Sequence, residues 1–267
     1  MRTYDARRVD DQQVGIPVHL IGHLDVILAL TRREIQSRFG ENALGYAWTF
    51  VAPLVWVAAT YFAFQFFART SPVFTDTITF IISGLIPYAA FRYVINAMGR
   101  SAVQVRGLLI FPNVTVAHAM ATAAMIEFCN IFIVYAVVAL VNYLAFGNGE
   151  MYNPLQFFLG VSLAWGLGVG YAYLFVVLGR IHATFTQAAQ VLLRPAFFIS
   201  GVFFTANELP ETMLNVLSWN PLLHAVEIAR DGMLFHYESR VSSPGYVLLW
   251  IVGLFSAGFT INLIRRP

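Results

Sequence analysis

The sequence predicts an all-α integral membrane protein with six transmembrane helices, and three observations lead to this prediction. Of the 267 residues, 58% are hydrophobic and only 11% are charged, whereas about a quarter of an ordinary soluble domain is charged. The mean hydropathy is +0.68, and the chain contains 24 Phe, 12 Tyr and 5 Trp. Several apolar stretches also reach the roughly 20 residues that a spanning helix needs. Together these features exclude a soluble enzyme.

The six predicted spans are separated by polar or glycine- and proline-containing connections. They cover residues 43–67, 77–97, 114–144, 155–178, 187–204 and 245–264. The fifth stretch is the least regular, because it either begins near Gln187 and bends at Pro195 or spans together with part of the following segment. We therefore expect one transmembrane domain over residues 43–267.

The N-terminal region, residues 1–42, is predicted to be a polar tail followed by an amphipathic helix. The first eighteen residues contain no apolar core of the kind that a secretory signal needs. From His23 to Phe39, apolar residues recur at helical spacing and charged residues occupy the rest of the helical wheel. Such a helix is typical of the membrane interface, and its polar face could also dock a soluble partner.

The distribution of arginine predicts the orientation of the chain. All sixteen basic residues are arginine, and twelve of them lie on one side if both termini are cytoplasmic. Only Arg69, Arg230 and Arg240 then lie outside, while Arg92 falls within the second span. The absence of lysine from the sequence excludes a Walker A motif, so any ATP chemistry belongs to another chain.

Two connections between spans carry further information. Met98–Asn113, on the cytoplasmic side, is long enough for a short helix that a motor subunit could push, although an ordinary solvated loop fits the segment equally well. On the outer side, residues 207–237 alternate apolar clusters with charged residues. We expect two short re-entrant helices there, broken at Asn220 and Pro221.

Four segments resemble the permease subunits of ABC-2 type polysaccharide exporters, in particular capsule export permeases of the KpsM type. They are RREIQSRFGENALGYAWTFVAPL (32–54), SGLIPYAAF (83–91), LLRPAFFISGVFF (192–204) and WNPLLHAVEIARDGM (219–233). The resemblance covers nearly the whole chain, and the first and last segments are the most specific.

This resemblance implies a partnership of several proteins. Two permease copies would pair with two ATP-binding cassette subunits, which bind ATP and Mg²⁺, so no cofactor is expected on this chain. The complex would export a lipid-linked polysaccharide across the inner membrane of a Gram-negative bacterium. A periplasmic adaptor and an outer-membrane export protein would complete the route in capsule systems. Membrane lipid surrounds such a protein, and nucleic acid is not an expected partner.

Three groups of candidate residues follow from these patterns. The coupling group, expected to contact the ATPase, comprises Arg32, Arg33, Glu34, Arg100, Gln104 and Arg106. The external gate group comprises Trp219, Asn220, Pro221, His224, Glu227 and Arg230. The substrate path group comprises Tyr46, Trp56, Tyr61, Phe64, Arg92, Glu127, Phe197 and Phe198.

Each path residue also has a structural interpretation. The aromatic rings could form a stacking surface for sugars, or could anchor and pack the helices. Arg92 could meet an anionic substrate or extend to the headgroups. Glu127, near the middle of the third span, needs a partner or a wet cavity, and pairing with Arg92 or with neighbouring hydroxyls is the leading interpretation.

Other functions remain as alternatives. An O-antigen or teichoic-acid permease of the same ABC-2 class is the nearest. A multi-span membrane transferase would need a cluster of polar groups at one depth, and the outer-face residues around Glu227, Arg230 and Asp231 are the only such cluster. Helical spacing explains that cluster as local ion pairing. A secondary transporter is disfavoured because inverted repeats are not evident, and the histidine spacing predicts no metal site.

Overall fold

The computed structural model describes residues 18–40, 43–73, 75–111, 114–147 and 151–264, which form helices joined by loops. The long helices are α1 (Val18–Gly40), α2 (Ala43–Phe66), α3 (Thr77–Gln104), α4 (Val116–Phe146), α5 (Pro154–Gly179), α6 (Thr184–Ile199) and α9 (Pro244–Ile264). The short ones are η1 (Val105–Leu108), η2 (Ala206–Glu208), α7 (Glu211–Leu217) and α8 (Pro221–Met233).

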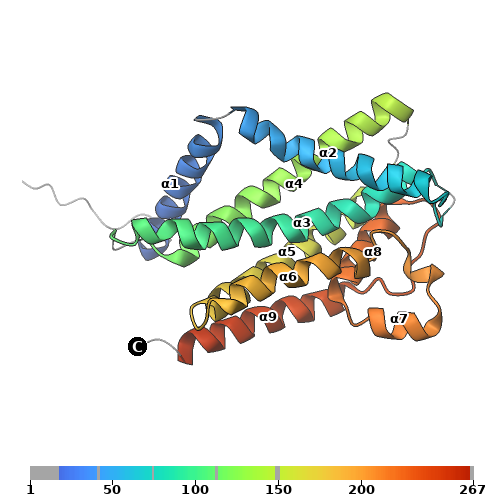
Figure 1. Cartoon of the computed structure of the whole chain (residues 1–267). Coiled ribbons are helices and arrows are strands. Elements are labelled where there is room, and N and C mark those ends of the chain that lie inside the picture. Colours follow the sequence, from blue (N-terminus) through green and yellow to red (C-terminus); the bar gives the residue numbers. More distant parts are fainter. Residues whose placement is uncertain (1–17, 41–42, 74, 112–113, 148–150, 265–267) are drawn as a thin grey trace, which may run out of the picture.

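The long helices form a bundle in which successive members reverse direction. Helices α2, α3, α4, α5, α6 and α9 run roughly along one axis, whereas α1 crosses that axis (Figure 1). One end of the bundle carries η1, the start of α6 and the end of α9; we call it the η1 end. The opposite end carries α7 and the α2–α3 connection; we call it the α7 end.

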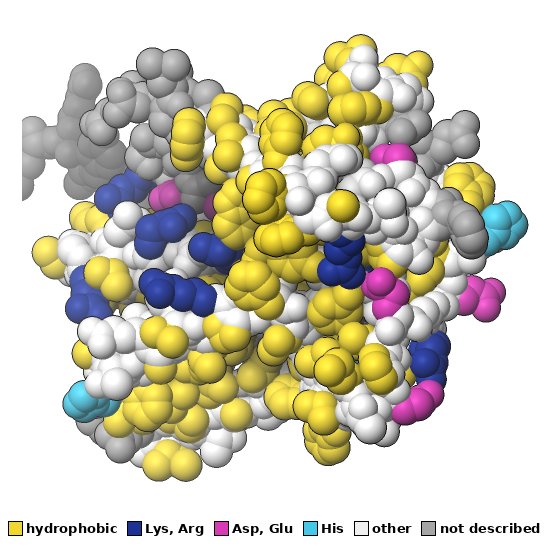
Figure 2. All heavy atoms as spheres, turned by 45° about the vertical axis from the view of Figure 1, so that its right-hand side comes forward, with side chains coloured by type: hydrophobic (Ala, Val, Ile, Leu, Met, Phe, Trp, Pro, Cys, Tyr) yellow, Lys and Arg dark blue, Asp and Glu magenta, His cyan; other side chains and the backbone are white. Residues whose placement is uncertain are grey.

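The surface has the composition of a membrane protein. Apolar side chains cover much of the molecule, and dark blue arginines gather towards the η1 end (Figure 2). In the described part of the chain, four helical stretches are long and apolar enough to cross a membrane: 77–108, 116–146, 154–179 and 244–264. A shorter apolar helix covers Phe50–Phe66. The prediction of an all-helical membrane protein is thereby confirmed.

Capping residues explain where several helices begin. Asp76 accepts a 2.8 Å hydrogen bond from the backbone N–H of Thr79 at the start of α3, and Thr115 forms a capping box with His118 at the start of α4. Helices α5 and α8 both begin with an asparagine cap followed by proline, at Asn153 and Asn220. These capping residues are local sequence signals that mark where a connection ends and the next helix begins.

Helix α3 is longer than the predicted second span. It continues to Gln104 and passes directly into η1. The short cytoplasmic helix expected within Met98–Asn113 is therefore not a separate element, because its first part is the last turns of α3.

Helix α6 differs from the predicted fifth span at both ends. It begins at Thr184 and ends at Ile199, whereas the prediction covered 187–204. Gly201 has a φ of +79°, which ends helical geometry after Ser200. The carbonyl oxygens of Gly201 and Phe204 accept hydrogen bonds from Arg230 of α8 instead of continuing the helix.

Helices α3, α5 and α8 form the centre of the protein. All but one of the residues of α8 are buried, and it packs on α3, α5 and α9. Glycines allow its close contact with α5: a Cβ atom at Gly160 would lie 2.4 Å from the backbone nitrogen of Ala229, and one at Gly232 would lie 2.2 Å from that of Phe157. Two backbones thus meet without intervening side chains, as is common for small residues in membrane helices.

Candidate functional site

A buried ion pair anchors α8 inside the protein. The side chains of Glu227 and Arg230 are both 0% exposed, and Arg230 Nη1 donates to Glu227 Oε1 one helical turn away. The sequence predicts this local pairing, which the structure confirms. Because both charges are away from solvent, they depend on their protein partners.

Arg230 connects α8 to two other parts of the chain. Its Nε lies 3.3 Å from Ser83 Oγ of α3, and its Nη2 and Nη1 donate to the carbonyl oxygens of Gly201 (2.6 Å) and Phe204 (3.0 Å). Its guanidinium also lies over the ring of Phe80, 4.7 Å from the centroid. We call Ser83, Glu227, Arg230, Tyr237 and Ser239 the α8 polar node.

The segment after α8 completes this node. Glu227 Oε2 accepts hydrogen bonds from Tyr237 Oη (2.5 Å) and Ser239 Oγ (2.6 Å). Burial raises the pKa of the Tyr237 hydroxyl, so Tyr237 remains a donor at neutral pH. Burial also raises the pKa of Asp231 to about 6, against the opposing effect of hydrogen bonds from Ser242 and Ser239. The node thus fixes α8, α3 and the two flanking loops together.

The other members of the predicted gate group lie at the start of α8. Asn220 accepts from the Leu222 N–H and donates to the Ile199 carbonyl and Ser200 Oγ. His224 Nε2 lies 2.8 Å from the Ser218 carbonyl, and its ring packs on Tyr246. Trp219 is exposed, and Pro221 is half-buried in the first turn. This group therefore joins α6, α8 and α9, and its inner members hold the fold together.

Aromatic side chains of α2, α3 and α6 meet beside the α8 polar node. The Trp56 ring lies 6.3 Å from Tyr88 and 5.2 Å from Phe197 between centroids, while Phe203 lies 4.9 Å from Phe197 and 5.7 Å from Phe198. We call this set the aromatic cluster, which consists of Trp56, Phe64, Phe80, Tyr88, Phe197, Phe198 and Phe203. The structure brings together four of the predicted path residues, which belong to α2 and α6.

The members of the aromatic cluster differ in accessibility. Phe64 is 3% exposed and packs on Phe80 and Phe203, so in this arrangement it is a packing residue. Phe198 is 62% exposed, and Trp56 and Phe197 are half-buried. Phe203, which follows α6, is also half-buried, so these four residues combine a ring held by aromatic contacts with an accessible face.

The remaining path residues are more dispersed. The Arg92 guanidinium lies 4.8 Å from the Trp56 ring centroid, a cation–π contact at the edge of the cluster. Glu127 is buried on α4, and both charges lie within electrostatic range of the Tyr93 hydroxyl. Their direct pairing stays a prediction. Tyr61 is half-buried beside Phe62, and the side chain of Tyr46 lies outside the part that the structure describes.

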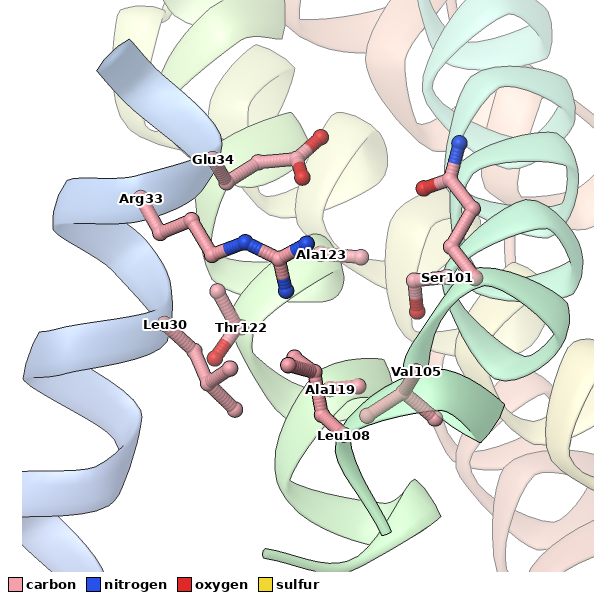
Figure 3. A pocket seen from close by; sticks show the side chains of 10 residues that line it. Leu30, Arg33, Glu34, Ser101, Val105, Leu108, Ala119, Thr122 and Ala123 are labelled. Atoms are coloured by element: carbon pink, nitrogen blue, oxygen red, sulfur yellow. The ribbon is translucent and has the colours of Figure 1, made fainter. Parts of the chain in front are cut away.

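Half of the predicted coupling group lines one cavity at the η1 end. This cavity has a volume of about 390 Å³ and lies between α1, the end of α3, η1 and the start of α4. Arg33 and Glu34 of α1 point towards its interior from one side, facing Ser101 and the η1 segment on the other (Figure 3), and Gln104 is also a lining residue. We call it the α1–η1 cavity. It can accept a polar, charge-bearing segment.

The other predicted coupling residues lie elsewhere. Arg106 lines a second cavity, between α3, α5 and α6. Arg32 and Arg100 are exposed on α1 and α3. The structure thus divides the six residues among three places: the α1–η1 cavity, the second cavity and the surface outside both.

Sequence reasoning missed several residues of the site. Ser83, Tyr88 and Tyr237 form buried hydrogen bonds to other parts of the chain but carry no charge, so their sequence signal is weak. Gly84 was also missed, although a Cβ atom there would lie 2.8 Å from Arg230 Nη2. The Ser-Gly pair at the start of SGLIPYAAF was the available signal. The serine supplies a hydroxyl that can accept a hydrogen bond, and the glycine leaves room for the Arg230 side chain.

Together, the long apolar helices and the exposed apolar side chains around the bundle define a multi-pass membrane protein. Residues 25–234 match the family model of the ABC-2 type transporter. The chain belongs to this family of membrane proteins.

Relatives in bacteria match over most of the chain. The polysialic acid transport protein KpsM of Escherichia coli is 30% identical over 239 residues, covering 89% of this chain and 92% of the relative. The capsule polysaccharide export inner-membrane protein BexB of Haemophilus influenzae is 26% identical, with 88% and 89% coverage. The O-antigen export system permease protein RfbA of Klebsiella pneumoniae is 22% identical, with 88% and 92% coverage.

Proposed function

We propose that this chain is the permease subunit of an ATP-driven exporter that moves lipid-linked capsular polysaccharide across the bacterial inner membrane. The observation that carries the proposal is the similarity to capsule and polysialic acid export proteins over nearly nine-tenths of the chain. The chain supplies the membrane passage, and a separate ATP-binding subunit with bound ATP and Mg²⁺ supplies the energy. The match to an O-antigen permease supports that substrate as the second candidate.

The proposed assembly contains two copies of this chain and two ATPase subunits, with a periplasmic adaptor and an outer-membrane export protein beyond them. We propose six spans, in which α2 and α6 accompany the four long apolar helices. The alternating helix directions and the arginines at the η1 end support cytoplasmic termini. Helix α1 then lies at the cytoplasmic interface, and α7 and α8 enter from the outer side.

The α1–η1 cavity is the proposed docking site for the ATPase. We expect Arg33→Glu combined with Gln104→Glu to weaken co-purification of the ATPase strongly, because like charges at a docking contact cost several kcal/mol. The measurement is pull-down of the ATPase with the tagged permease, together with surface polysaccharide in the same cells.

A matched charge reversal at the other end serves as the control for docking. Arg240→Glu changes an arginine that pairs with Glu211 near the α7 end, so ATPase binding should be unchanged. Equal recovery of the ATPase with the double variant and with wild type would refute docking at this cavity.

The accessible rings of the aromatic cluster are the proposed guide for the polymer. A long polymer needs many weak contacts, and aromatic faces stack on sugar rings without holding them tightly. We expect Phe198→Ala to lower surface polysaccharide several-fold at constant membrane protein level, because most of that ring is free of packing. Phe198→Tyr keeps a ring and should restore export.

A comparison with Phe64→Ala separates guiding from packing. Phe64 is buried, so its loss should reduce the amount of folded protein and export together. If Phe198→Ala also lowered folded protein and export in parallel, the guiding role would be excluded. If polysaccharide export did not depend on this chain at all, the proposed function itself would fail.

A further inference from the structure

A second cavity at the η1 end is distinct from both the α1–η1 cavity and the aromatic cluster. It has a volume of about 430 Å³ and lies between the end of α3, η1, the end of α5 and the start of α6. We call it the Arg106–Arg180 cleft after its two charged lining residues. The helices are close at one side of it, since a Cβ atom at Gly179 would lie 2.5 Å from Thr186 Oγ1.

The charge of this cleft is positive. Arg106 lies on η1 and Arg180 caps the end of α5, and both are exposed. Among the residues that line the cleft, none is acidic. Arg180 Nη1 donates to Asn262 Oδ1 of α9 at 3.2 Å, which orients that guanidinium while leaving further N–H donors. Two guanidinium groups without a lining carboxylate favour a phosphate ligand.

Most of the rest of the lining is apolar, although Thr186 and Gln190 of α6 also line the cleft. The apolar part includes Ile95, Ala102, Ala172, Phe175 and Val176, which come from α3 and α5. A soluble phosphate metabolite gains little from such walls, whereas the acyl chains of an amphiphile bury apolar area against them.

The segment next to η1 indicates that the cleft lies beside lipid. Residues 109–111 form an exposed apolar run, in which Ile110 is 86% exposed. Exposed apolar residues next to arginine are typical of the membrane interface, where the charged groups meet headgroups and the apolar groups meet acyl chains. The leaflet at the arginine-rich end therefore offers a ligand of the required chemistry.

We infer that the Arg106–Arg180 cleft binds an anionic phospholipid of the surrounding membrane. The lipid phosphate lies between the two guanidinium groups, and the first carbons of the acyl chains lie along α3 and α5. Basic pockets between helices at a membrane surface bind anionic headgroups in this way. The lipid joins α3, α5 and α6 at the end where η1 begins. This inference goes beyond the proposed function and does not depend on which polymer is exported.

Native mass spectrometry of the full chain tests the site directly. The protein is produced in a host without capsule, so lipid-linked polysaccharide is absent, and is titrated with dioleoylphosphatidylglycerol or dioleoylphosphatidylcholine. We expect the first lipid molecule that binds to be phosphatidylglycerol, with about tenfold preference over phosphatidylcholine. Arg106→Gln with Arg180→Gln should abolish this preference, whereas Arg100→Gln with Arg194→Gln, two arginines outside the cleft lining, should keep it.

A second variant tests the apolar part without altering charge. Gly99 lines the cleft, and a Cβ atom there has no neighbouring atom within 4 Å, so Gly99→Leu starts in open space and adds apolar volume to the cleft. It should reduce phosphatidylglycerol binding, and free glycerol 1-phosphate should not compete with the lipid.

Two results would overturn the inference. One is equal binding of the two lipids by the unmodified chain. The other is an unchanged preference for phosphatidylglycerol in the Arg106→Gln/Arg180→Gln variant. Loss of the ATPase from the complex of this variant would then assign the cleft to the ATPase subunit.

Discussion

Replacing Arg230 with methionine is expected to abolish accumulation of the folded protein. Arg230 and Glu227 are fully buried, and removing the guanidinium leaves the Glu227 carboxylate without its counter-ion and the Gly201 and Phe204 carbonyl groups without their arginine donor. Breaking one side of a buried ion pair costs about 3–5 kcal/mol, a large part of a typical folding free energy of about 5–15 kcal/mol. The measurement is the amount of monodisperse protein extracted from membranes and its thermal midpoint.

Two further variants make this result specific to the buried charge. Arg240 pairs with Glu211 at an exposed site, where an ion pair contributes about 0–1 kcal/mol, so Arg240→Met should leave the thermal midpoint nearly unchanged. Adding Glu227→Gln to Arg230→Met should recover part of the folded protein, because it removes the unpaired charge. Wild-type yield and thermal midpoint for Arg230→Met alone would show that the node does not stabilise the fold.

The second large effect is expected from Gly160→Val. A Cβ atom at Gly160 would lie 2.4 Å from the backbone nitrogen and 2.7 Å from the Cα of Ala229. Backbone atoms of a buried helix cannot rotate away, so α5 and α8 must separate. Overpacking a core costs about 1–3 kcal/mol and occasionally more, and we expect the upper part of that range. The thermal midpoint of the purified protein measures it.

Gly253 of α9 provides the matched glycine for comparison. A Cβ atom there meets nothing within 4 Å, so Gly253→Ala should be neutral or slightly stabilising, as alanine favours a helix by about 0.5–1 kcal/mol over glycine. Similar thermal midpoints for Gly160→Val and Gly253→Ala would contradict the close α5–α8 contact. In the expected case, the glycine at 160 is required by packing and the one at 253 is not.

Both predictions concern α8, and its position has a functional consequence. The α8 polar node joins the loop after α6 to α3, and the aromatic cluster lies on α2, α3 and α6. We therefore expect a change in the node to shift Phe197 and Phe198. Through this arrangement, we expect residues at the α7 end to affect the proposed polymer path without contacting the polymer.

The sequence by itself determined the class of protein and most of its elements. Charge fraction and hydropathy established an all-helical membrane protein, and the long apolar stretches located its main helices, because lipid-facing helices need continuous apolar residues. The asparagine at 220 and the proline at 221 placed the break between α7 and α8. The spacing of Glu227 and Arg230 also gave their ion pair, since residues three apart share one helix face.

Only the tertiary structure decided what the polar residues do. The end of α6 depends on carbonyl groups that bond to Arg230, a residue about thirty positions further along the chain, so no local pattern reveals it. The separation of Arg33 from Arg106 into two cavities depends on how α1, α5 and α6 pack around α3. Phe64 and Phe198 have the same side chain and differ only in burial. Helix periodicity is local, whereas burial and cavities arise from contacts between distant segments, and this is why the sequence defined the helices but not the site.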